Sequence, residues 1–381
     1  MKRAGLYIHI PFCRAKCSYC DFYSIADHDE QIPGFVAALI QEFIHTDINT
    51  SEWTIDTIFF GGGTPSLLSP NDLRRILAVA RKKFHIDGLP EITLEANPGE
   101  APKSKLIEFR EAGINRLSIG AQSFNKDMLQ FLTRIHLTED ILRTFEAARN
   151  SGFENISCDV IYNIPGQSID DWKKDLEKVV ALGPEHVSAY SLTVEKGTPL
   201  FNEVQTGRVR IPSESVSTKM ILRTNEFLNN RGYRQYEISN YALRGFECKH
   251  NIHYWKIDPY FGFGPSAHSF DDEKRWSNFS NLDKYISSIK NNRSPVQHTS
   301  VLTSLSLANE IIGFGMRMNA GFSINQLPIR FRTGLSQKVE SLNSDWAGMI
   351  IQENDRIRLS DQGLLFADAL AVELMLDPND Q

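Results

Sequence analysis

The sequence predicts an α/β fold that consists of a partial (β/α)6 barrel followed by a small winged-helix-like α+β domain. Over the first two-thirds of the 381 residues, short β-branched runs alternate with stretches of helical periodicity, which is typical of parallel β/α units. Near the C-terminus the pattern changes to helices around a hairpin-like run. Because about six units are recognisable rather than the usual eight, we expect an open barrel.

The barrel strands are predicted from short runs of apolar and β-branched residues. These runs are Leu6–Ile10, Thr57–Phe60, Ile92–Glu95, Arg116–Ile119, Ile156–Ile161 and His186–Tyr190. Between them, Ser69 is expected to cap a helix that Pro70 begins. Two further helices are predicted over Asp140–Asn150 and Asp170–Leu182, each stopped by a nearby glycine.

The chain divides into three predicted parts. Residues 1–235 form the barrel, which ends with a longer helix over Pro212–Gly232. Residues 236–295 are rich in aromatic residues, Gly and Asn and show little helical periodicity, so we expect a connecting segment there. Residues 296–381 form the winged-helix-like domain.

Within the C-terminal domain, helices are expected over Thr303–Met318 and Asp361–Met375, on either side of a hairpin-like run at Met349–Leu359. Winged helices often bind DNA, which requires a positively charged face. Residues 301–381, however, hold six Lys and Arg against ten Asp and Glu, a net charge of −4. An interaction or capping domain is therefore the better interpretation.

The overall composition excludes several classes of protein. A formal net charge of −6 and an isoelectric point near 6.0 give no electrostatic reason to expect nucleic acid or an anionic membrane as partner. No stretch approaches the roughly 18 consecutive apolar residues that a membrane span needs. The apolar stretch at the N-terminus is too short for a signal peptide, so we expect a cytoplasmic protein that is not integral to a membrane.

The cysteines point to a metal site. A disulfide framework would want an even number of cysteines spread along the chain, whereas this chain has five. Three of them lie within eight residues, and Cys158 and Cys248 lie far away. This clustering indicates a metal centre in a reducing compartment.

Cys13, Cys17 and Cys20 follow the first predicted strand with the spacing Cys-x3-Cys-x2-Cys. Three thiolates on one loop can hold three corners of a [4Fe–4S] cluster, which leaves one iron open. S-adenosylmethionine can fill that position through its amino and carboxylate groups, and one electron then breaks a carbon–sulfur bond to yield a 5′-deoxyadenosyl radical. A zinc site is the alternative, and it is disfavoured because no second CxxC or HxxxH pair follows.

Further candidate residues end the other predicted strands. A glycine-rich turn, Gly61-Gly62-Gly63-Thr64-Pro65, follows the second strand, and its backbone can approach a ligand closely. Glu95 ends the third strand, Gln122 follows the fourth and Asp159 lies in the fifth. Because an α/β barrel carries its site at the carboxyl ends of its strands, these side chains should converge with the cysteine loop. Asp159 suits ribose hydroxyls, and Arg134 suits a carboxylate.

Several motifs together resemble the oxygen-independent coproporphyrinogen III dehydrogenase superfamily of radical SAM proteins, over nearly the whole chain. The motifs are Tyr7-x-His9-Ile10-Pro11-Phe12-Cys13, the three cysteines, Gly61-Gly62-Gly63-Thr64-Pro65-Ser66, Glu95-Ala96-Asn97-Pro98-Gly99, Ser118-Ile119-Gly120-Ala121-Gln122-Ser123-Phe124 and Asp159-x5-Pro165-Gly166-Gln167. The resemblance implies that Gly62 and Gly63, with Thr64 beside them, contact the methionine part of S-adenosylmethionine. It implies that Glu95 and Arg134 bind the amino-acid end of the cofactor, and that Gln122 and Asp159 bind its ribose. Tyr7 would lie near the cluster and the sulfonium.

Two branches of the superfamily differ in their cysteine motif and in the length of their N-terminal extension. The dehydrogenases resemble one another in a fourth cysteine two residues after the third and in a longer N-terminal extension. Here Asp21-Phe22 follows Cys20, and the cluster loop begins a dozen residues into the chain. The chain instead looks like the HemW-type haem chaperone branch, whose HNxxYW motif stands here as His250-Asn251-Ile252-His253-Tyr254-Trp255. That resemblance implies a protein that binds haem as cargo and delivers it to acceptor haemoproteins.

The chemistry of the motif is compatible with haem. An imidazole can ligate haem iron, and Tyr254 and Trp255 offer flat apolar faces to a porphyrin. His250 is the first candidate for the iron ligand because it opens the motif together with Asn251. The identity of the ligand stays open, since other candidates lie close in sequence: His253, His268 and Cys248.

Two departures from the superfamily concern loop geometry. Asn163 stands where relatives usually have Gly before the Pro-Gly-Gln turn, and Thr133 precedes Arg134 where Gly is common. The resemblance also suggests a homodimer, which neither periodicity nor charge indicates.

A radical enzyme is the rival hypothesis, either an oxidase of the coproporphyrinogen type or an enzyme for another tetrapyrrole. The cofactor site looks intact, which is what such an enzyme needs, so enzymatic activity stays open. The lack of a fourth cysteine argues against coproporphyrinogen oxidation itself. A third hypothesis is a winged-helix regulator with an iron–sulfur sensor. The acidic C-terminal domain disfavours it, because DNA binding requires positive charge.

Overall fold

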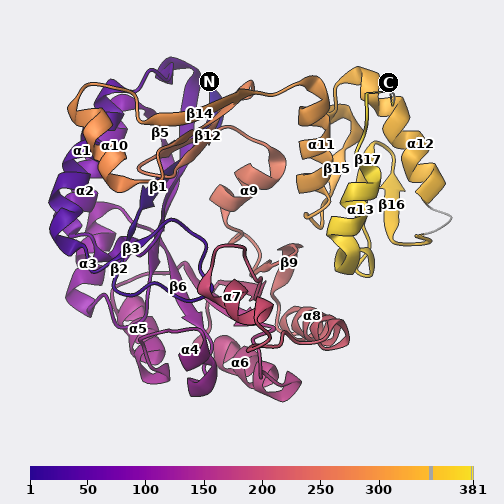
Figure 1. The fold of residues 1–381 in the computed structure, drawn as a ribbon, viewed down its shortest axis with the longest axis horizontal. Coiled ribbons are helices and arrows are strands. Elements are labelled where there is room, and N and C mark those ends of the chain that lie inside the picture. Colours follow the sequence, from indigo (N-terminus) through magenta and orange to yellow (C-terminus); the bar gives the residue numbers. More distant parts are fainter. Residues whose placement is uncertain (343–345, 379, 381) are drawn as a thin grey trace.

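The computed structural model describes residues 1–342, 346–378 and 380 (Figure 1). Within these residues one twelve-stranded sheet runs through the larger part of the molecule. In order across that sheet the strands are β14 (Val296–Val301), β13 (Lys274–Asn278), β12 (His268–Phe270), β11 (Tyr260–Phe263), β1 (Lys2–Ile10), β4 (Trp53–Gly62), β5 (His85–Ala96), β6 (Arg116–Gln122), β7 (Ile156–Tyr162), β8 (His186–Ser191), β10 (Asn240–Ala242) and β9 (Arg234–Glu237).

All six predicted barrel strands are confirmed as β1 and β4 to β8, which lie side by side and parallel in chain order. Their carboxyl ends therefore share one edge of the sheet. The main difference is β5, which begins at His85 rather than at Ile92. Its first half includes Asp87, Gly88 and Pro90, which are poor strand formers, so the sequence does not predict a strand there.

Helices cover the outer face of the curved sheet, where α1, α2, α3 and α5 pack against one another in sequence and α6 packs on α8 (Figure 1). The helices of this part are α1 (Ile32–His45), α2 (Pro70–Lys83), α3 (Lys103–Ala112), α4 (Lys126–Phe131), α5 (Thr138–Asn150), α6 (Ile169–Leu182), α7 (Pro199–Gln205) and α8 (Glu214–Asn229). The predicted caps are confirmed: the Ser69 hydroxyl accepts from the Asp72 amide at the start of α2, and Gly183 ends α6 in the left-handed region.

Residues 236–295 return to the main sheet at both of its edges. They complete the pair β9–β10 beside β8 and supply β11, which runs parallel to β1, and β12 and β13, which continue the sheet beyond it. Despite its weak helical periodicity, the segment contains two helices, α9 (Lys249–Lys256) and α10 (Leu282–Lys290). Helices of two turns carry too little periodicity to stand out in a sequence, and tertiary contacts stabilise them.

One such contact explains where α9 begins. The carboxylate of Glu91, on β5, accepts hydrogen bonds from the backbone amides of Lys249 and His250, each at 3.2 Å. These amides belong to the first turn of α9 and have no partner within the helix. The negative charge also complements the positive end of the helix dipole. A residue far away in the sequence thus caps this helix.

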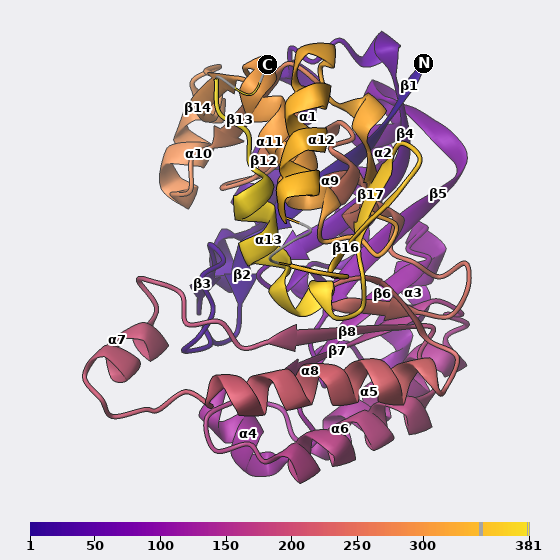
Figure 2. The same ribbon diagram turned by 90° about the vertical axis from the view of Figure 1, so that its right-hand side faces the viewer.

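The C-terminal residues form a unit with its own hydrophobic core, seen from the side in Figure 2. It comprises α11 (Ser304–Gly315), α12 (Arg332–Leu342), α13 (Ala367–Leu374) and a sheet of β15 (Phe322–Ser323), β17 (Arg356–Leu359) and β16 (Ile350–Glu353). The predicted hairpin is confirmed as β16–β17, and the predicted helices correspond to α11 and α13. Helices around a small antiparallel sheet agree with the winged-helix-like prediction.

Candidate iron–sulfur and cofactor site

The three cysteines lie on the loop that follows β1 at the carboxyl edge of the sheet. Cys13 belongs to the short strand β2 (Phe12–Cys13), which pairs with β3 (Ile25–Ala26) and closes the loop at its base. The Cys20 amide donates to the Cys17 carbonyl at 3.2 Å, which folds the loop on itself. All three thiols are free and partly exposed. The thiols also lie close enough to interact electrostatically, and burial raises the pKa of Cys20 to about 11.

The glycine-rich turn packs directly against this loop, as the sequence predicted. The Gly63 amide donates to the Ile10 carbonyl at 2.8 Å, and the Thr64 amide donates to the Phe12 carbonyl at 2.7 Å. The Thr64 hydroxyl lies 3.5 Å from the Cys13 sulfur. A Cβ atom at Gly63 would stand 2.6 Å from the Phe12 carbonyl oxygen, so only glycine allows this approach.

Arg134 reaches the cysteine loop from the other side. Its Nη1 lies 3.5 Å from the Cys17 sulfur, and its Nη2 donates to the Gly120 carbonyl and to the Asn97 side chain. The Asn97 amide nitrogen in turn donates to the Thr64 hydroxyl at 2.9 Å. Asn97 therefore joins the glycine-rich turn to Arg134. No role was predicted for Asn97, although its place just after β5, at the carboxyl edge of the sheet, is typical of a site residue.

Glu95 on β5 and Asp159 on β7 lie near Tyr7 and His250 on the inner side of the sheet, and the region that these four residues surround is called the chamber. An oxygen of Glu95 accepts from the Gly62 amide at 3.2 Å. Burial, and then the negative charge of Asp159, raise the pKa of Glu95 to about 8. Asp159 accepts hydrogen bonds from the hydroxyls of Ser118 at 2.8 Å and Ser157 at 2.9 Å. Ser118 belongs to a motif in which no role was predicted for it, and Ser157 was not predicted. With its raised pKa, Glu95 is protonated at neutral pH, and a positively charged ligand with hydroxyl groups would favour its ionised form and hydrogen-bond to the pair.

Gln122 ends β6 with φ of 64°, in the left-handed region. Its amide nitrogen would lie 2.8 Å from a Cβ at Gly120, so the side chain folds back over the strand end toward the chamber. Thr133 (φ 53°) and Asn163 (φ 63°) also have left-handed backbones. That conformation favours glycine, the residue that the family resemblance leads us to expect at both positions.

Tyr7 lies beneath the chamber on β1. Its hydroxyl is 3.1 Å from Nδ1 of His9, and Nε2 of His9 is 2.8 Å from the Tyr23 carbonyl oxygen on the cysteine loop. Burial, and then the charge of Glu95, raise the pKa of Tyr7, so it stays protonated. The rings of Tyr7, Phe59 and His250 form a cluster, with Tyr7 6.3 Å from each of the other two ring centres and Phe59 stacked on His250 at 5.2 Å.

His250 lies inside the barrel, with 1% of its surface exposed. Its Nδ1 is 2.8 Å from the Thr57 hydroxyl, and its Nε2 is 2.8 Å from the Tyr254 hydroxyl. Burial lowers the pKa of His250 well below its ordinary value, which keeps the ring neutral. In this conformation neither ring nitrogen is free for iron. Iron ligation by His250 stays a prediction that requires α9 to move.

The rest of the HNxxYW motif divides between two surroundings. Tyr254 follows His250 by one helical turn and stacks edge-on against Tyr260, at 4.6 Å between ring centres. Trp255 points the other way and contacts Arg317 and Phe314, which lies on α11 of the C-terminal unit. Asn251 lies partly buried on α9 between these two sides. The helix therefore joins the floor of the chamber to the C-terminal unit.

The donors present fit an iron–sulfur cluster better than a single metal ion. Among the described residues, no group of three or more His, Cys, Asp or Glu side chains is close enough to hold one ion, which disfavours the zinc alternative. A cubane cluster spreads its thiolates over several irons, so its three cysteines need not converge on one point. Cys13, Cys17 and Cys20 would hold the cluster. The glycine-rich turn lies beside them, and a Cβ at Gly63 would prevent this close approach.

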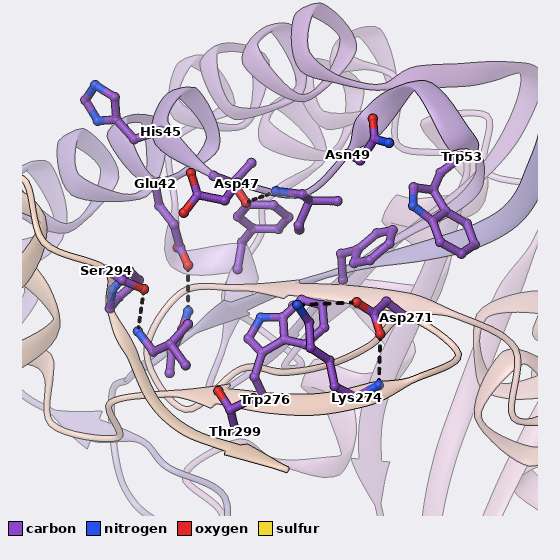
Figure 3. Close-up of a pocket in the computed structure, with 18 of the residues that line it drawn as sticks. Glu42, His45, Asp47, Asn49, Trp53, Asp271, Lys274, Trp276, Ser294 and Thr299 are labelled. Atoms are coloured by element: carbon purple, nitrogen blue, oxygen red, sulfur yellow. Dashed lines mark hydrogen bonds and ion pairs between the residues drawn. The ribbon is translucent and has the colours of Figure 1, made fainter. Parts of the chain in front are cut away.

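A separate cavity of about 1090 Å³ lies at the opposite, amino edge of the sheet. It opens between the end of α1 and the strands β11 to β14, and Figure 3 shows Trp276 and Lys274 on the strand side and Asp47 and Asn49 on the other. None of the predicted site residues lines it. Despite its size, this cavity is therefore not the predicted cofactor site.

Comparisons with known proteins agree with this geometry. Residues 7–179 match the radical SAM superfamily. The chain is 35% identical over 365 residues to the heme chaperone HemW of Bacillus subtilis, which covers 95% of this chain and 96% of that protein. It is 32% identical over 381 residues to HemW of Lactococcus lactis, covering 99% and 98%. The chain belongs to the HemW-type radical SAM family.

Membership in this family implies a [4Fe–4S] cluster and S-adenosylmethionine as cofactors. The zebrafish radical S-adenosyl methionine domain-containing protein 1, mitochondrial, is also similar, at 32% identity over 98% of this chain and 87% of that protein. Among solved structures, coproporphyrinogen III oxidase (HemN) from Escherichia coli shares the fold of this HemW-type chain, with a TM-score of 0.83 at 22% identity over 98% of this chain and 90% of that one. In the described residues, no helix is long and apolar enough to cross a membrane.

Proposed function

We propose that this HemW-type protein is a cytoplasmic haem chaperone that uses a [4Fe–4S] cluster and S-adenosylmethionine, binds haem and delivers it to acceptor haemoproteins. The observation that carries the proposal is its identity of 35% to the Bacillus subtilis heme chaperone HemW over nearly the full length of both chains. The HNxxYW motif adds support, because its His250 stacks on Tyr7 and bonds to Tyr254 near the residues proposed to bind S-adenosylmethionine.

The residues of the chamber have distinct parts in this proposal. Cys13, Cys17 and Cys20 hold the cluster, and Arg134 orients the loop through Cys17 and the Gly120 carbonyl. Gly62 and Gly63, with Thr64, receive the methionine part of S-adenosylmethionine. Glu95 and Arg134 bind its amino-acid end, and Asp159 and Gln122 its ribose. When bound, the cluster supplies one-electron reduction of S-adenosylmethionine.

Haem titration of the anaerobically reconstituted protein tests the proposal, with absorbance as the readout. We expect stoichiometric binding with a defined Soret band, and transfer of the haem to an apo-haemoprotein that requires the intact cluster. A protein that binds no haem would contradict the chaperone function. Product analysis with coproporphyrinogen III, reductant and S-adenosylmethionine tests the rival, which requires protoporphyrinogen to form.

A further inference from the structure

The histidines of the chain are candidate haem ligands, because imidazole is a common axial ligand of haem iron. A ligand needs a ring nitrogen that is neutral and free of other partners. The chain has ten histidines, all within the described residues. Burial and hydrogen bonding separate them into two groups of five.

The first group is buried and engaged. His136 bonds through Nε2 to the Ala121 carbonyl, and because the residue is only 5% exposed, burial keeps its other nitrogen from a haem. The other four have a partner at both ring nitrogens: His9 with Tyr7 and Tyr23, His186 with Ser157 and Tyr236, His250 with Thr57 and Tyr254, and His253 with Asp56 and Asp258. The two carboxylates also raise the pKa of His253 to about 9 despite its burial, so that ring is protonated and cannot ligate iron.

The second group is exposed, and its members differ in their partners and in their distance from the chamber. His28 bonds with Glu30 and Gln31. His45 ends α1 and His85 begins β5, so both lie at the amino edge, away from the cysteine loop. His298 lies on β14, at the outer edge of the sheet. Only His268, on β12, remains near the chamber.

The register of the sheet places His268 on the same face as the chamber. Tyr260 on β11 pairs with Phe270 on β12, and Tyr260 contacts Tyr254 of α9 on that face. Because side chains alternate along a strand, His268 lies on the same face as Phe270. Gly262, on β11, approaches the His268 backbone so closely that a Cβ there would be 2.2 Å from its carbonyl oxygen.

The surroundings of His268 suit an iron ligand. Its ring is close enough to His9 to interact with it electrostatically, and His9 bonds to Tyr23 on the cysteine loop. Partial burial, and then the charge of Arg275, lower the pKa of His268, which keeps the imidazole neutral.

We propose that His268 coordinates the iron of bound haem on the chamber face of the sheet, while His250 holds α9 in place. The assignment rests on the proposed haem chaperone function. An exposed ligand is chemically suited to a carrier, since an acceptor can approach the iron and take it over. The bond formed is a coordinate bond from a ring nitrogen of His268 to iron, with no redox change.

The test is anaerobic haem titration of the reconstituted full-length chain and of single variants, followed by absorbance. We expect His268→Ala to weaken binding about tenfold or more and to change the Soret band. His268→Met, which offers a thioether ligand, should retain binding with a different Soret position. Iron content and circular dichroism establish that each variant carries its cluster and is folded.

Two controls make the result specific. His298→Ala removes an exposed histidine in the same row of the sheet, since Ser277 pairs with both His268 and His298. His45→Ala removes the exposed histidine that lines the large cavity. Both should bind haem as the wild type does. If the wild type binds haem and His268→Ala is unchanged, the ligand assignment is wrong but the chaperone function stands. If the wild type binds no haem, both fail.

Discussion

The imidazole of His250 and the hydroxyl of Thr57 lie 2.8 Å apart inside the barrel, although 193 positions separate them in the chain. This bond joins α9 to β4 at a place where water is excluded. Gly5, on the neighbouring strand β1, leaves room for the contact, because a Cβ there would stand 2.9 Å from the Thr57 hydroxyl and 3.0 Å from the His250 ring. The helix that carries the HNxxYW motif is thus packed as part of the core.

Thr57→Val should destabilise the protein while preserving the shape of the side chain. The substitution leaves Nδ1 of His250 buried without its partner, which costs about 1–3 kcal/mol. Urea unfolding monitored by circular dichroism measures the change. Thr299→Val, at an exposed position of β14, is the matched control and should leave the midpoint unchanged. An equal midpoint for wild type and Thr57→Val would show that this bond does not hold α9.

Asp159→Asn should weaken the binding of S-adenosylmethionine about tenfold, because the ribose loses a charge-assisted hydrogen bond. Equilibrium dialysis of the anaerobically reconstituted protein measures the dissociation constant. Asp170→Asn, in the exposed first turn of α6, should have no effect. Unaltered affinity in Asp159→Asn would remove Asp159 from the cofactor site.

Replacing any one of Cys13, Cys17 and Cys20 with Ala should abolish the cluster, because each thiolate holds one iron. Iron and sulfide analysis after reconstitution, together with visible absorbance, measures this. Cys158→Ala removes a buried thiol outside the loop and should retain the full iron content. A cluster that persists in Cys17→Ala would show that another side chain supplies a ligand.

Glu42 should make the stability of the fold depend on pH. Its carboxylate is buried behind the large cavity and accepts from the Gly264 amide, Asn278 and Tyr285. Burial raises its pKa from 4.5 to about 7 despite these donors. Protonation is therefore favoured in the folded state. The associated stability is present below pH 4.5 and is lost as the pH rises through about 7.

The loss amounts to roughly 3 kcal/mol, from about 1.4 kcal/mol for each pH unit of the shift. Urea midpoints measured across that pH range should fall in the wild type and change much less in Glu42→Gln. Glu146→Gln, on the exposed side of α5, should follow the wild type. If Glu42→Gln retains the full pH dependence, another group is responsible.

Much of the barrel and of the cluster loop could be predicted because their signals are local. A buried parallel strand needs a short run of apolar and β-branched residues, and every barrel strand has one, for example Ile156–Tyr162. The carboxyl ends of such strands meet at one edge, so Glu95 and Asp159 could be expected near the cysteines. Asn97, Ser118 and Ser157 could not be assigned, because their roles depend on which partner the fold brings to them.

The sequence by itself determined the fold class, the cysteine loop and the family, since spacing and periodicity are properties of neighbouring residues. The tertiary structure decided what the HNxxYW motif does in the folded chain. Glu91 begins α9 from a distant strand, and Thr57 and Tyr254 occupy both nitrogens of His250. A histidine in a sequence is equally able to bind metal or to donate a hydrogen bond, and only the neighbours that folding places around it separate these roles.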